Sequence, residues 1–418
     1  MVRMKTLSTF VLPGLASHLS MVAAAGQTCE NGVRPYSAWL ADSIIARKDA
    51  VMNADTENDV SLSLKLGLFQ LSVIHLKEYY DAASCAKEDW DAYLKEATDS
   101  ILPTVLDVDG DIEAPMDIFA TANGLYYQYE NSGSESYKQG LDALRKAYDG
   151  RKRNSEGGFW YYNARPNLSY LDETYPLGAF TTVYKNRFEP TNGTLAENLS
   201  KDLNQFKDHC HHDTGLMAHG YDASKSAPWA NKTTGASPYV WDRALGWYHM
   251  GLVELLHNAD KFPGLFNQTQ RDDAYKKYYN LANTIINDVD ETTGCWWQVM
   301  EHGGEQGNYI ETSGSAMFTY SILKGVRLGY LTGVHPESGK DYKQTAEKCY
   351  SWLLENRVVR DDSGTLSVNG TVGVCTLEDP TYEYYTTQPL SYNSVFGAAP
   401  LVMASLEHEM AAANAVSS

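Results

Sequence analysis

Apolar residues recur at helical spacing in twelve separate segments, and this feature most limits what the 418-residue chain can fold into. Polar or glycine-containing connections separate the segments. No alternation of strand and helix patterns occurs that would predict a parallel sheet. The sequence therefore predicts an all-α protein with helices near residues 34–53, 60–82, 87–101, 115–131, 135–149, 174–188, 194–211, 240–258, 270–288, 312–331, 339–357 and 394–413.

Twelve helices at near-regular spacing can pair as six helical hairpins. Six hairpins can close into an (α/α)6 toroid, in which inner and outer helices alternate along the chain. The length suits one large toroid with a substantial core, and no low-complexity linker or abrupt change of composition divides it. We therefore expect a single (α/α)6 domain over residues 26–418.

The N-terminal segment has the features of a secretory signal peptide over residues 1–25. Arg3 and Lys5 are basic, residues 10–22 are largely apolar, and the alanines at 23–25 form a small-residue cleavage site. We expect the mature chain to begin near Gly26 and to be secreted to the extracellular space. No other apolar run is long enough to cross a bilayer.

Cysteines and glycosylation sequons fit that location. Six cysteines follow the predicted cleavage site and none forms a CxxC pair, so a zinc site is not expected. An even number in a secreted chain predicts disulfides, with the pairing left open. The cysteines are Cys29, Cys85, Cys210, Cys295, Cys349 and Cys375, and N-glycans are expected on some of the six sequons at Asn167, Asn192, Asn198, Asn231, Asn267 and Asn369.

The net charge of −19 excludes several classes of partner. Such a surface repels nucleic acid and anionic lipid, so we expect neither nucleic acid nor membrane as a partner. It also repels an anionic ligand, which would need a local positive group. The 29 tyrosines and 9 tryptophans provide faces on which sugar rings pack, although many of them are expected in the core.

Four long connections share a turn glycine followed by aromatic or polar residues. Each follows an odd-numbered predicted helix and precedes an even-numbered one, so in an alternating toroid all four emerge on the same face. Long loops gathered on one face of a rigid scaffold commonly carry function. The four are residues 157–162, 215–222, 294–298 and 370–373.

Two aspartates stand near the predicted starts of inner helices. Asp172 precedes the helix at 174–188, and Asp117 lies near the start of the helix at 115–131. Either can have a local role, since an N-cap carboxylate stabilises a helix by about 1 kcal/mol and the helix dipole favours first-turn acids. Alternatively, two carboxylates that point into one cavity raise each other's pKa and act in acid–base chemistry. Position alone favours a cap for Asp172 and supports both interpretations of Asp117 equally.

Residues 219–247 contain further candidates. His219 is followed by Gly220, and a lone histidine is usually structural. Trp241, Arg243 and Trp247 do not share one helical face, but they can surround a pocket if the helix starts between them. Arg243 is the best candidate for a local positive group, because a guanidinium binds a carboxylate through two hydrogen bonds. The alternative is an arginine paired with an acid such as Asp242, and for Glu311 a structural role is favoured.

Read together, these segments resemble glycoside hydrolase family 105, in particular secreted unsaturated rhamnogalacturonyl hydrolases of the fungal type. The segment from Gly157 to Trp160 that leads to Asp172 resembles the loop that carries the family's catalytic aspartate. Residues 215–247 and 308–330 match most closely, and the resemblance covers residues 111–409. Several motifs in order at compatible spacing make it specific.

The resemblance implies an (α/α)6 enzyme that acts on lyase-generated pectin oligosaccharides ending in a 4,5-unsaturated uronic acid. It implies that Asp172 is the general acid/base and Asp117 its partner acid. It further implies a sugar site without metal or cofactor, lined by Tyr161, Tyr170, His219, Trp241, Arg243 and Trp247.

The chain departs from bacterial relatives at three points. Tyr161-Tyr162 replaces a frequent His-Lys, Tyr170 replaces a frequent tryptophan, and a basic residue is missing around residues 393–397. These differences leave open the exact uronate and the sugar next to it. The alternatives are an unsaturated glucuronyl hydrolase that acts on other uronic-acid glycans and a catalytically inactive sugar-binding protein. A toroidal endo-mannanase is disfavoured, because both Asp-Asp pairs lie in polar outer segments.

Overall fold

The computed structural model describes Cys29 and residues 34–417, and it confirms the predicted all-α class. The predicted signal peptide over residues 1–25 lies outside the described residues. Twelve helical segments form the scaffold: α1 (Tyr36–Arg47), α2 (Leu62–Tyr79), α4 (Trp90–Val105), the 3-10 helix η2 (Met116–Thr121) continuing into α6 (Ala122–Ser132), α7 (Glu135–Gly150), α8 (Thr174–Phe188), α9 (Thr194–His209), α10 (Asp242–Lys261), α11 (Gln268–Asn287), α12 (Thr312–Arg327), α13 (Tyr342–Arg357) and α15 (Val395–Ser417). Short helical segments in the connections are α3 (Ala82–Cys85), α5 (Val108–Glu113), η3 (Leu171–Glu173), η4 (Met300–His302) and α14 (Tyr382–Thr387).

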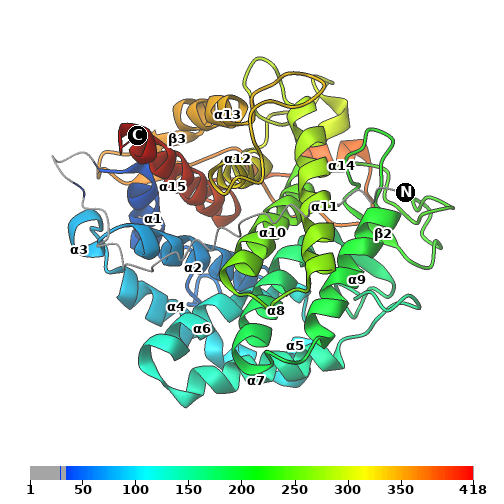
Figure 1. Cartoon of the computed structure of the whole chain (residues 1–418), viewed down its shortest axis with the longest axis horizontal. Helices are drawn as coiled ribbons and strands as arrows, with labels where there is room; N and C mark the ends of the chain where they lie inside the picture. The colour runs from blue at the N-terminus through cyan, green and yellow to red at the C-terminus, as the bar shows by residue number, and fades with distance from the viewer. Residues whose placement is uncertain (1–28, 30–33, 418) are drawn as a thin grey trace, which may run out of the picture.

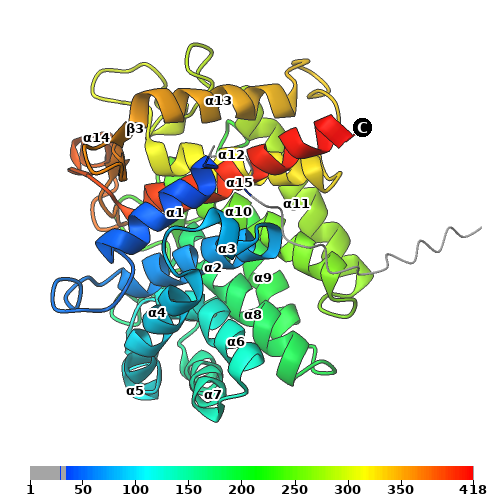
Figure 2. The same cartoon turned by 90° about the vertical axis from the view of Figure 1, so that its left-hand side faces the viewer.

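The helices form two concentric rings. The inner ring runs α2, α6, α8, α10, α12 and α15; each inner helix packs on the next, and α15 returns to pack on α2. The outer ring consists of α1, α4, α7, α9, α11 and α13. The colour runs around the ring until α1 and α15, from opposite ends of the chain, lie side by side (Figures 1 and 2). The predicted (α/α)6 toroid of six hairpins is therefore confirmed.

Burial distinguishes inner from outer helices. Every residue of α12 from Thr312 to Gly325 is buried, whereas the outer helix α13 buries only five residues along one face. Inner helices are surrounded by protein, and their backbones approach closely. A Cβ atom at Gly314 would lie 2.2 Å from the Asp242 carboxylate of α10, so this position requires glycine.

Three short antiparallel strand pairs pin the connections between helices. They are β1 (Leu168–Tyr170) with β2 (Gly220–Asp222), β3 (Val358–Arg360) with β4 (Leu366–Val368), and β5 (Thr371–Val372) with β6 (Leu390–Ser391). Strands of two or three residues leave no readable alternation in a sequence, and none was predicted. In Figure 2, β3 and α14 lie together on one side of the ring.

The turn glycines of the four long connections adopt the conformation that their position requires. Gly157, Gly215, Gly294 and Gly370 have φ values of 84°, 84°, 78° and 77°. This left-handed region is open to glycine at no steric cost. The signal that identified these connections in the sequence is therefore a backbone requirement.

The cysteines differ from the prediction that all six form disulfides. Cys29 pairs with Cys85 and Cys295 pairs with Cys349, but Cys210 and Cys375 are free and buried. Cys210 follows α9, whereas Cys375 lies in the connection after β5. The even number of cysteines predicted disulfides, but it could not show which cysteines lie close enough to pair. Within the described residues, no helix has both the length and the apolar character needed to cross a membrane.

Candidate active site

The pairing of β1 with β2 brings Asp172 next to His219. Tyr170 pairs with Gly220, and the backbone N–H of Leu171 donates to the His219 carbonyl at 3.1 Å. A side chain at Gly220 would place its Cβ 2.3 Å from the Ser169 carbonyl oxygen, so only glycine permits this approach. The chain then turns through η3 and leaves Asp172 Oδ2 at 3.6 Å from His219 Nε2.

Asp172 is not a helix cap. The N-cap residue of α8 is Glu173, which makes no side-chain capping hydrogen bond. The Asp172 side chain is 12% exposed, and neither its Oδ2 nor the Nε2 of His219 has a hydrogen-bond partner among the described residues. Unsatisfied buried polar groups are costly, which favours a functional role over the capping role that position alone suggested.

A second set of contacts fixes Asp117. The Tyr161 hydroxyl donates to Asp117 Oδ1, and the Met116 N–H donates to the Tyr161 carbonyl at 3.2 Å. The buried Arg151 donates to that same carbonyl at 2.8 Å and to the Asp111 carbonyl at 2.8 Å. This guanidinium therefore ties the end of α5 to the loop of residues 157–167 that carries Tyr161, called the aromatic loop below.

Both aspartates line one small cavity of about 30 Å³ at the N-terminal ends of the inner helices. Seven of the eight predicted site residues line it: Asp117, Tyr161, Tyr170, Asp172, Trp241, Arg243 and Trp247. His219 does not; it is fully buried behind Asp172. Six further residues line the cavity that were not predicted from the sequence: Ser61, Leu64, Tyr162, Val374, Cys375 and Phe396.

Aromatic rings form a continuous wall around the carboxylates. The ring centroids of Tyr161 and Tyr170 are 5.1 Å apart, and those of Tyr170 and His219 are 5.2 Å apart. The wall continues from His219 to Trp241 at 4.8 Å. Because α10 begins at Asp242, Trp241 and Arg243 lie on either side of the helix start. This is the condition under which the two side chains were expected to surround one pocket.

Burial raises the pKa of Asp117 to about 7. The charge of Asp172 adds to this rise, whereas the Tyr161 hydroxyl and the Arg151 guanidinium oppose it. The site therefore contains an aspartic acid that holds a proton near neutral pH beside a second aspartate side chain. Such pairs are typical of acid–base catalysis.

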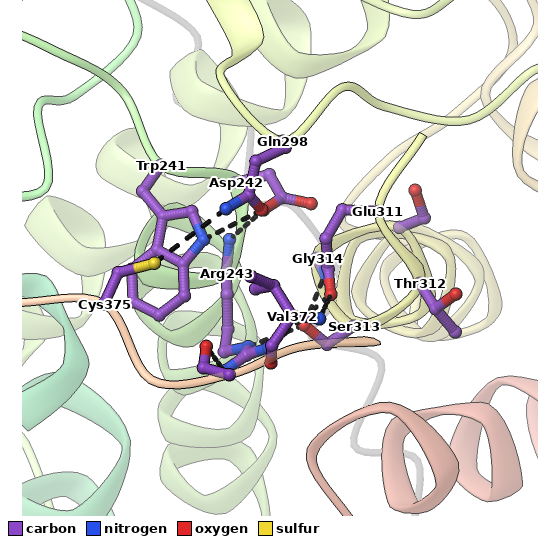
Figure 3. A network of polar contacts seen from close by, with 12 residues as sticks. Trp241, Asp242, Arg243, Gln298, Glu311, Thr312, Ser313, Gly314, Val372 and Cys375 are labelled. Carbon is purple, nitrogen blue, oxygen red and sulfur yellow. Dashed lines mark hydrogen bonds and ion pairs between the residues drawn. The ribbon is translucent and has the colours of Figure 1, made fainter. Parts of the chain in front are cut away.

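The protein itself occupies most of the hydrogen-bonding capacity of Arg243 (Figure 3). Its Nε donates to Ser313 at 2.6 Å and its Nη1 to the Gly373 carbonyl at 3.1 Å. Its Nη2 donates to the Val372 carbonyl and lies 3.5 Å from a Glu311 carboxylate oxygen. One of the five guanidinium N–H groups remains free, so the two-hydrogen-bond contact with a substrate carboxylate considered above is not available in this arrangement.

Glu311 and Asp242 complete this network. Glu311 caps α12 by accepting from the Gly314 N–H at 2.8 Å, and it also accepts from Val372 N–H at 2.9 Å. It does not line the cavity, which agrees with the structural role favoured for it. Burial and the Glu311 charge hold the pKa of Asp242 well above its ordinary value. The positive charge of Arg243 thus compensates the negative charge of the buried acids, and its guanidinium packs over the rings of Trp241 and Phe396.

The family model described as Glycosyl Hydrolase Family 88 matches residues 36–412 of the chain. The chain belongs to this family. Protein Atu3128 of Agrobacterium fabrum is 36% identical over 203 residues, which are 46% of this chain and 82% of that protein. The 24.9 kDa protein in the picA locus of Rhizobium radiobacter matches to the same extent.

Solved structures agree with the assignment. A family 105 glycoside hydrolase from C. acetobutylicum ATCC 824 is 29% identical, with a TM-score of 0.78 over 90% of this chain and 100% of that one. The unsaturated glucuronyl hydrolase of Bacillus sp. GL1 shares the fold, with 12% identity and a TM-score of 0.63 over 90% and 95% of the two chains. The family 105 assignment made from the sequence is confirmed, and the protein is a glycoside hydrolase.

Tyr385 is a neighbour of the site that the sequence gave no means of finding. Its hydroxyl lies 2.8 Å from His219 Nδ1, and its carbonyl accepts from Gln298 Nε2 at 3.0 Å. When the hydroxyl donates to Nδ1, Nε2 carries the ring proton and faces Asp172. Tyr385 lies on a six-residue helix in the last long connection, where no periodicity marks it.

A second, larger cavity of about 330 Å³ lies between α2, α6, α8 and α10. Its buried Glu254 pairs with Lys324 at 2.6 Å, and Glu78 pairs with Lys261 at 3.1 Å. Tyr175 lines this cavity and packs at 5.1 Å on Trp247, which lines the catalytic one. Because its three acids, Glu78, Glu130 and Glu254, are each paired with a lysine or an arginine, we assign the chemistry to the smaller cavity.

Asp117→Asn is expected to stabilise the enzyme increasingly as pH rises. Asp117 has a folded-state pKa of about 7, against an unfolded value of about 4. Between these values the folded state holds a proton that the unfolded state has released, so the free energy of unfolding of the wild type falls with rising pH, by at most about 1.4 kcal/mol per unit for this group. Asparagine removes this titration, and the Tm difference between variant and wild type should widen from about pH 4 to about pH 8. A difference that stays constant with pH would contradict the assignment.

Proposed function

We propose that this glycoside hydrolase releases the terminal 4,5-unsaturated uronic acid from lyase-generated pectin oligosaccharides, with rhamnogalacturonan fragments as its substrates. The observation that carries the proposal is Asp172 in an aromatic-lined cavity, with a carboxylate oxygen left unsatisfied 3.6 Å from His219. Family membership supports the same reading, since a structural relative is named an unsaturated glucuronyl hydrolase.

The proposed chemistry is hydration of an enol ether. Asp172 delivers a proton to C4 of the unsaturated ring, and positive charge develops at C5 and the ring oxygen. The resulting carboxylate then removes a proton from a water molecule as its oxygen bonds to C5, which restores the acid. The hemiketal formed at C5 opens and releases the neighbouring sugar, so one molecule of water is consumed. A single bifunctional acid suffices, unlike the two-carboxylate arrangement of most glycosidases.

The remaining residues of the cavity bind and orient the substrate in this proposal. Tyr161, Tyr170 and Trp247 provide ring faces against which the sugar packs. Asp117, held by Tyr161, donates a hydrogen bond to a sugar hydroxyl while it is protonated and tunes Asp172 through its charge when it is not. His219 orients Asp172 from behind.

We also propose that the enzyme acts outside the cell and carries N-glycans on some of its six sequons. Two disulfides are compatible with secretion, because such bonds persist in oxidising compartments. Mass spectrometry of the secreted protein before and after glycosidase treatment tests the glycans.

The decisive test is the reaction in heavy water on a lyase-treated rhamnogalacturonan digest. The ultraviolet absorbance of the conjugated double bond should fall, and early product should carry deuterium at C4 on one face, because Asp172 delivers its proton to carbon. The NMR measurement must be made early, since the C5 ketone of the product permits slow exchange at C4. Early product without deuterium at C4 would show ordinary glycosidic cleavage. Turnover of unsaturated glucuronyl substrates, without turnover of rhamnogalacturonan fragments, would show that the enzyme acts on other uronic-acid glycans. Turnover of neither substrate class would indicate a sugar-binding protein.

A further inference from the structure

The cavity needs a positive group for an anionic substrate, and the two most buried guanidiniums near it are committed elsewhere. Arg243 gives four of its N–H groups to the protein. Arg151 donates to carbonyl groups at the end of α5 and in the aromatic loop, and of its nitrogens only Nε lacks a partner among the described residues. A substrate carboxylate that accepts two hydrogen bonds would have to displace an internal partner of Arg243, and would leave a buried group unsatisfied.

Arg165 is held differently. Its guanidinium lies 5.2 Å from the centroid of the Tyr162 ring, which lines the catalytic cavity, and its Nη2 forms an ion pair with Glu378. The Arg165 side chain is 29% exposed, whereas Glu378 is 66% exposed. Within the described part of the chain, Nη1 of Arg165 is buried and has no hydrogen-bond partner. Of the two terminal nitrogens, Nη1 therefore has no partner among the described residues and Nη2 is bound to an acid that water can readily solvate. The guanidinium also forms a hydrogen bond with the Tyr170 hydroxyl.

Arg165 and Asp172 lie within electrostatic reach of the same two cavity tyrosines. The Asp172 charge raises the pKa of both Tyr162 and Tyr170, whereas the Arg165 guanidinium lowers the pKa of both. A uronic acid placed with its C4 at Asp172 carries its carboxylate on the adjacent C5. That carboxylate would then lie against the same tyrosine wall that Arg165 flanks.

The Arg165–Glu378 pair also holds together two segments of the cavity wall. It joins the aromatic loop to the connection after β5, whose Val374 and Cys375 line the cavity. The Leu377 N–H reinforces this junction by donating to the Tyr170 hydroxyl at 3.2 Å. A cavity of about 30 Å³ holds roughly one water molecule. A sugar ring can enter only if the segments that line the cavity move apart.

We propose that Arg165 binds the carboxylate of the terminal uronic acid, and that Glu378 occupies the guanidinium until substrate displaces it. This inference rests on the proposed function. When the substrate carboxylate replaces that of Glu378, the net charge around Arg165 is unchanged. The two terminal nitrogens of Arg165 can then form the two parallel hydrogen bonds that suit a carboxylate. The exchange also releases the ion pair that ties the connection after β5 to the aromatic loop, so the substrate's own charge helps these segments to move apart.

Lys65 is the competing cation on the other side of the cavity. Its Nζ lies 5.2 Å from the centroid of the cavity residue Phe396 and 2.5 Å from Asp59. Asp59 is only 29% exposed, whereas Glu378 is 66% exposed. Water therefore solvates a released Asp59 carboxylate less well, and breaking the Lys65–Asp59 pair costs more free energy. An ammonium also lacks the planar fork of a guanidinium. These differences favour Arg165.

The test compares Arg165→Met and Glu378→Gln on the unsaturated disaccharide and on its carboxyl methyl ester. Arg165→Met should raise KM for the acid by about tenfold or more and leave KM for the ester nearly unchanged. Glu378→Gln should instead lower KM for the acid by about two- to fivefold, because it removes the competing carboxylate. A purely structural ion pair predicts that both variants change KM in the same direction, and that outcome would overturn the proposal.

Controls separate this inference from its alternatives. The exposed pair Arg187–Glu130 lies outside the residues that line the catalytic cavity, and Arg187→Met and Glu130→Gln should leave KM unchanged. An acid-specific rise of KM in Lys65→Met rather than in Arg165→Met would assign the uronate to Lys65 instead. Wild-type enzyme is assayed first. If it does not consume the acid substrate, the proposed function fails, whereas normal wild-type turnover with an unaffected Arg165→Met variant refutes only the role of Arg165.

Discussion

Replacement of Asp172 by asparagine is expected to lower kcat by about 10²–10⁴-fold, the usual cost of removing a general acid/base. Asparagine keeps the size of the side chain but neither donates a proton to C4 nor accepts one from water. The fold should persist, because Asp172 makes no capping hydrogen bond and its Oδ2 has no partner among the described residues. The measurement is steady-state turnover of an unsaturated uronyl disaccharide, with Tm as a check on folding.

The effect should fall on kcat rather than on KM, because the lost interaction belongs to the transition state. Asp213→Asn is the matched control: it changes an exposed aspartate between α9 and β2 and should leave turnover unchanged. An Asp172→Asn enzyme with near-wild-type kcat would remove Asp172 from the mechanism. A large loss of Tm in the same variant would indicate a structural role.

Replacement of Arg243 by alanine is expected to destabilise the fold by about 3–5 kcal/mol, as measured by denaturant unfolding. Arg243 is 1% exposed and lies beside Glu311, which is 0% exposed. Its removal leaves a buried acid without a counter-charge and the Val372 and Gly373 carbonyls without their donor. From the sequence, Arg243 was expected to bind the substrate; in the structure its main contacts are internal.

A double-mutant cycle distinguishes these two roles. If Arg243 balances buried acidity, Arg243→Ala combined with Glu311→Gln should be less destabilising than the sum of the single changes. Loss of the exposed Arg187 guanidinium in Arg187→Ala should cost no more than about 1 kcal/mol. An Arg243→Ala protein of wild-type stability whose KM rises strongly would restore the binding role.

Several features of this protein are local and could be read from the sequence. The twelve helices follow from apolar periodicity, because an amphipathic helix must bury one face. The turn glycines, such as Gly157 and Gly215, mark positions that require positive φ. Asp172 and Asp117 stand near helix starts, and an alternating toroid places such starts on one face. These inferences need only local conformation and a closed ring.

The tertiary structure decided which of these residues meet. His219 contacts Tyr385 across 166 residues, and Tyr161 contacts Asp117 across 44. Neither pairing leaves a periodic signal, because it depends on how loops from different hairpins converge over the ring. The same convergence pairs Arg243 with Glu311, leaves Cys210 and Cys375 outside the two disulfides and places Arg165 beside an exposed acid. Sequence spacing specifies which face of a helix is buried, but the partner of a charged or reactive side chain is fixed only when distant segments pack together.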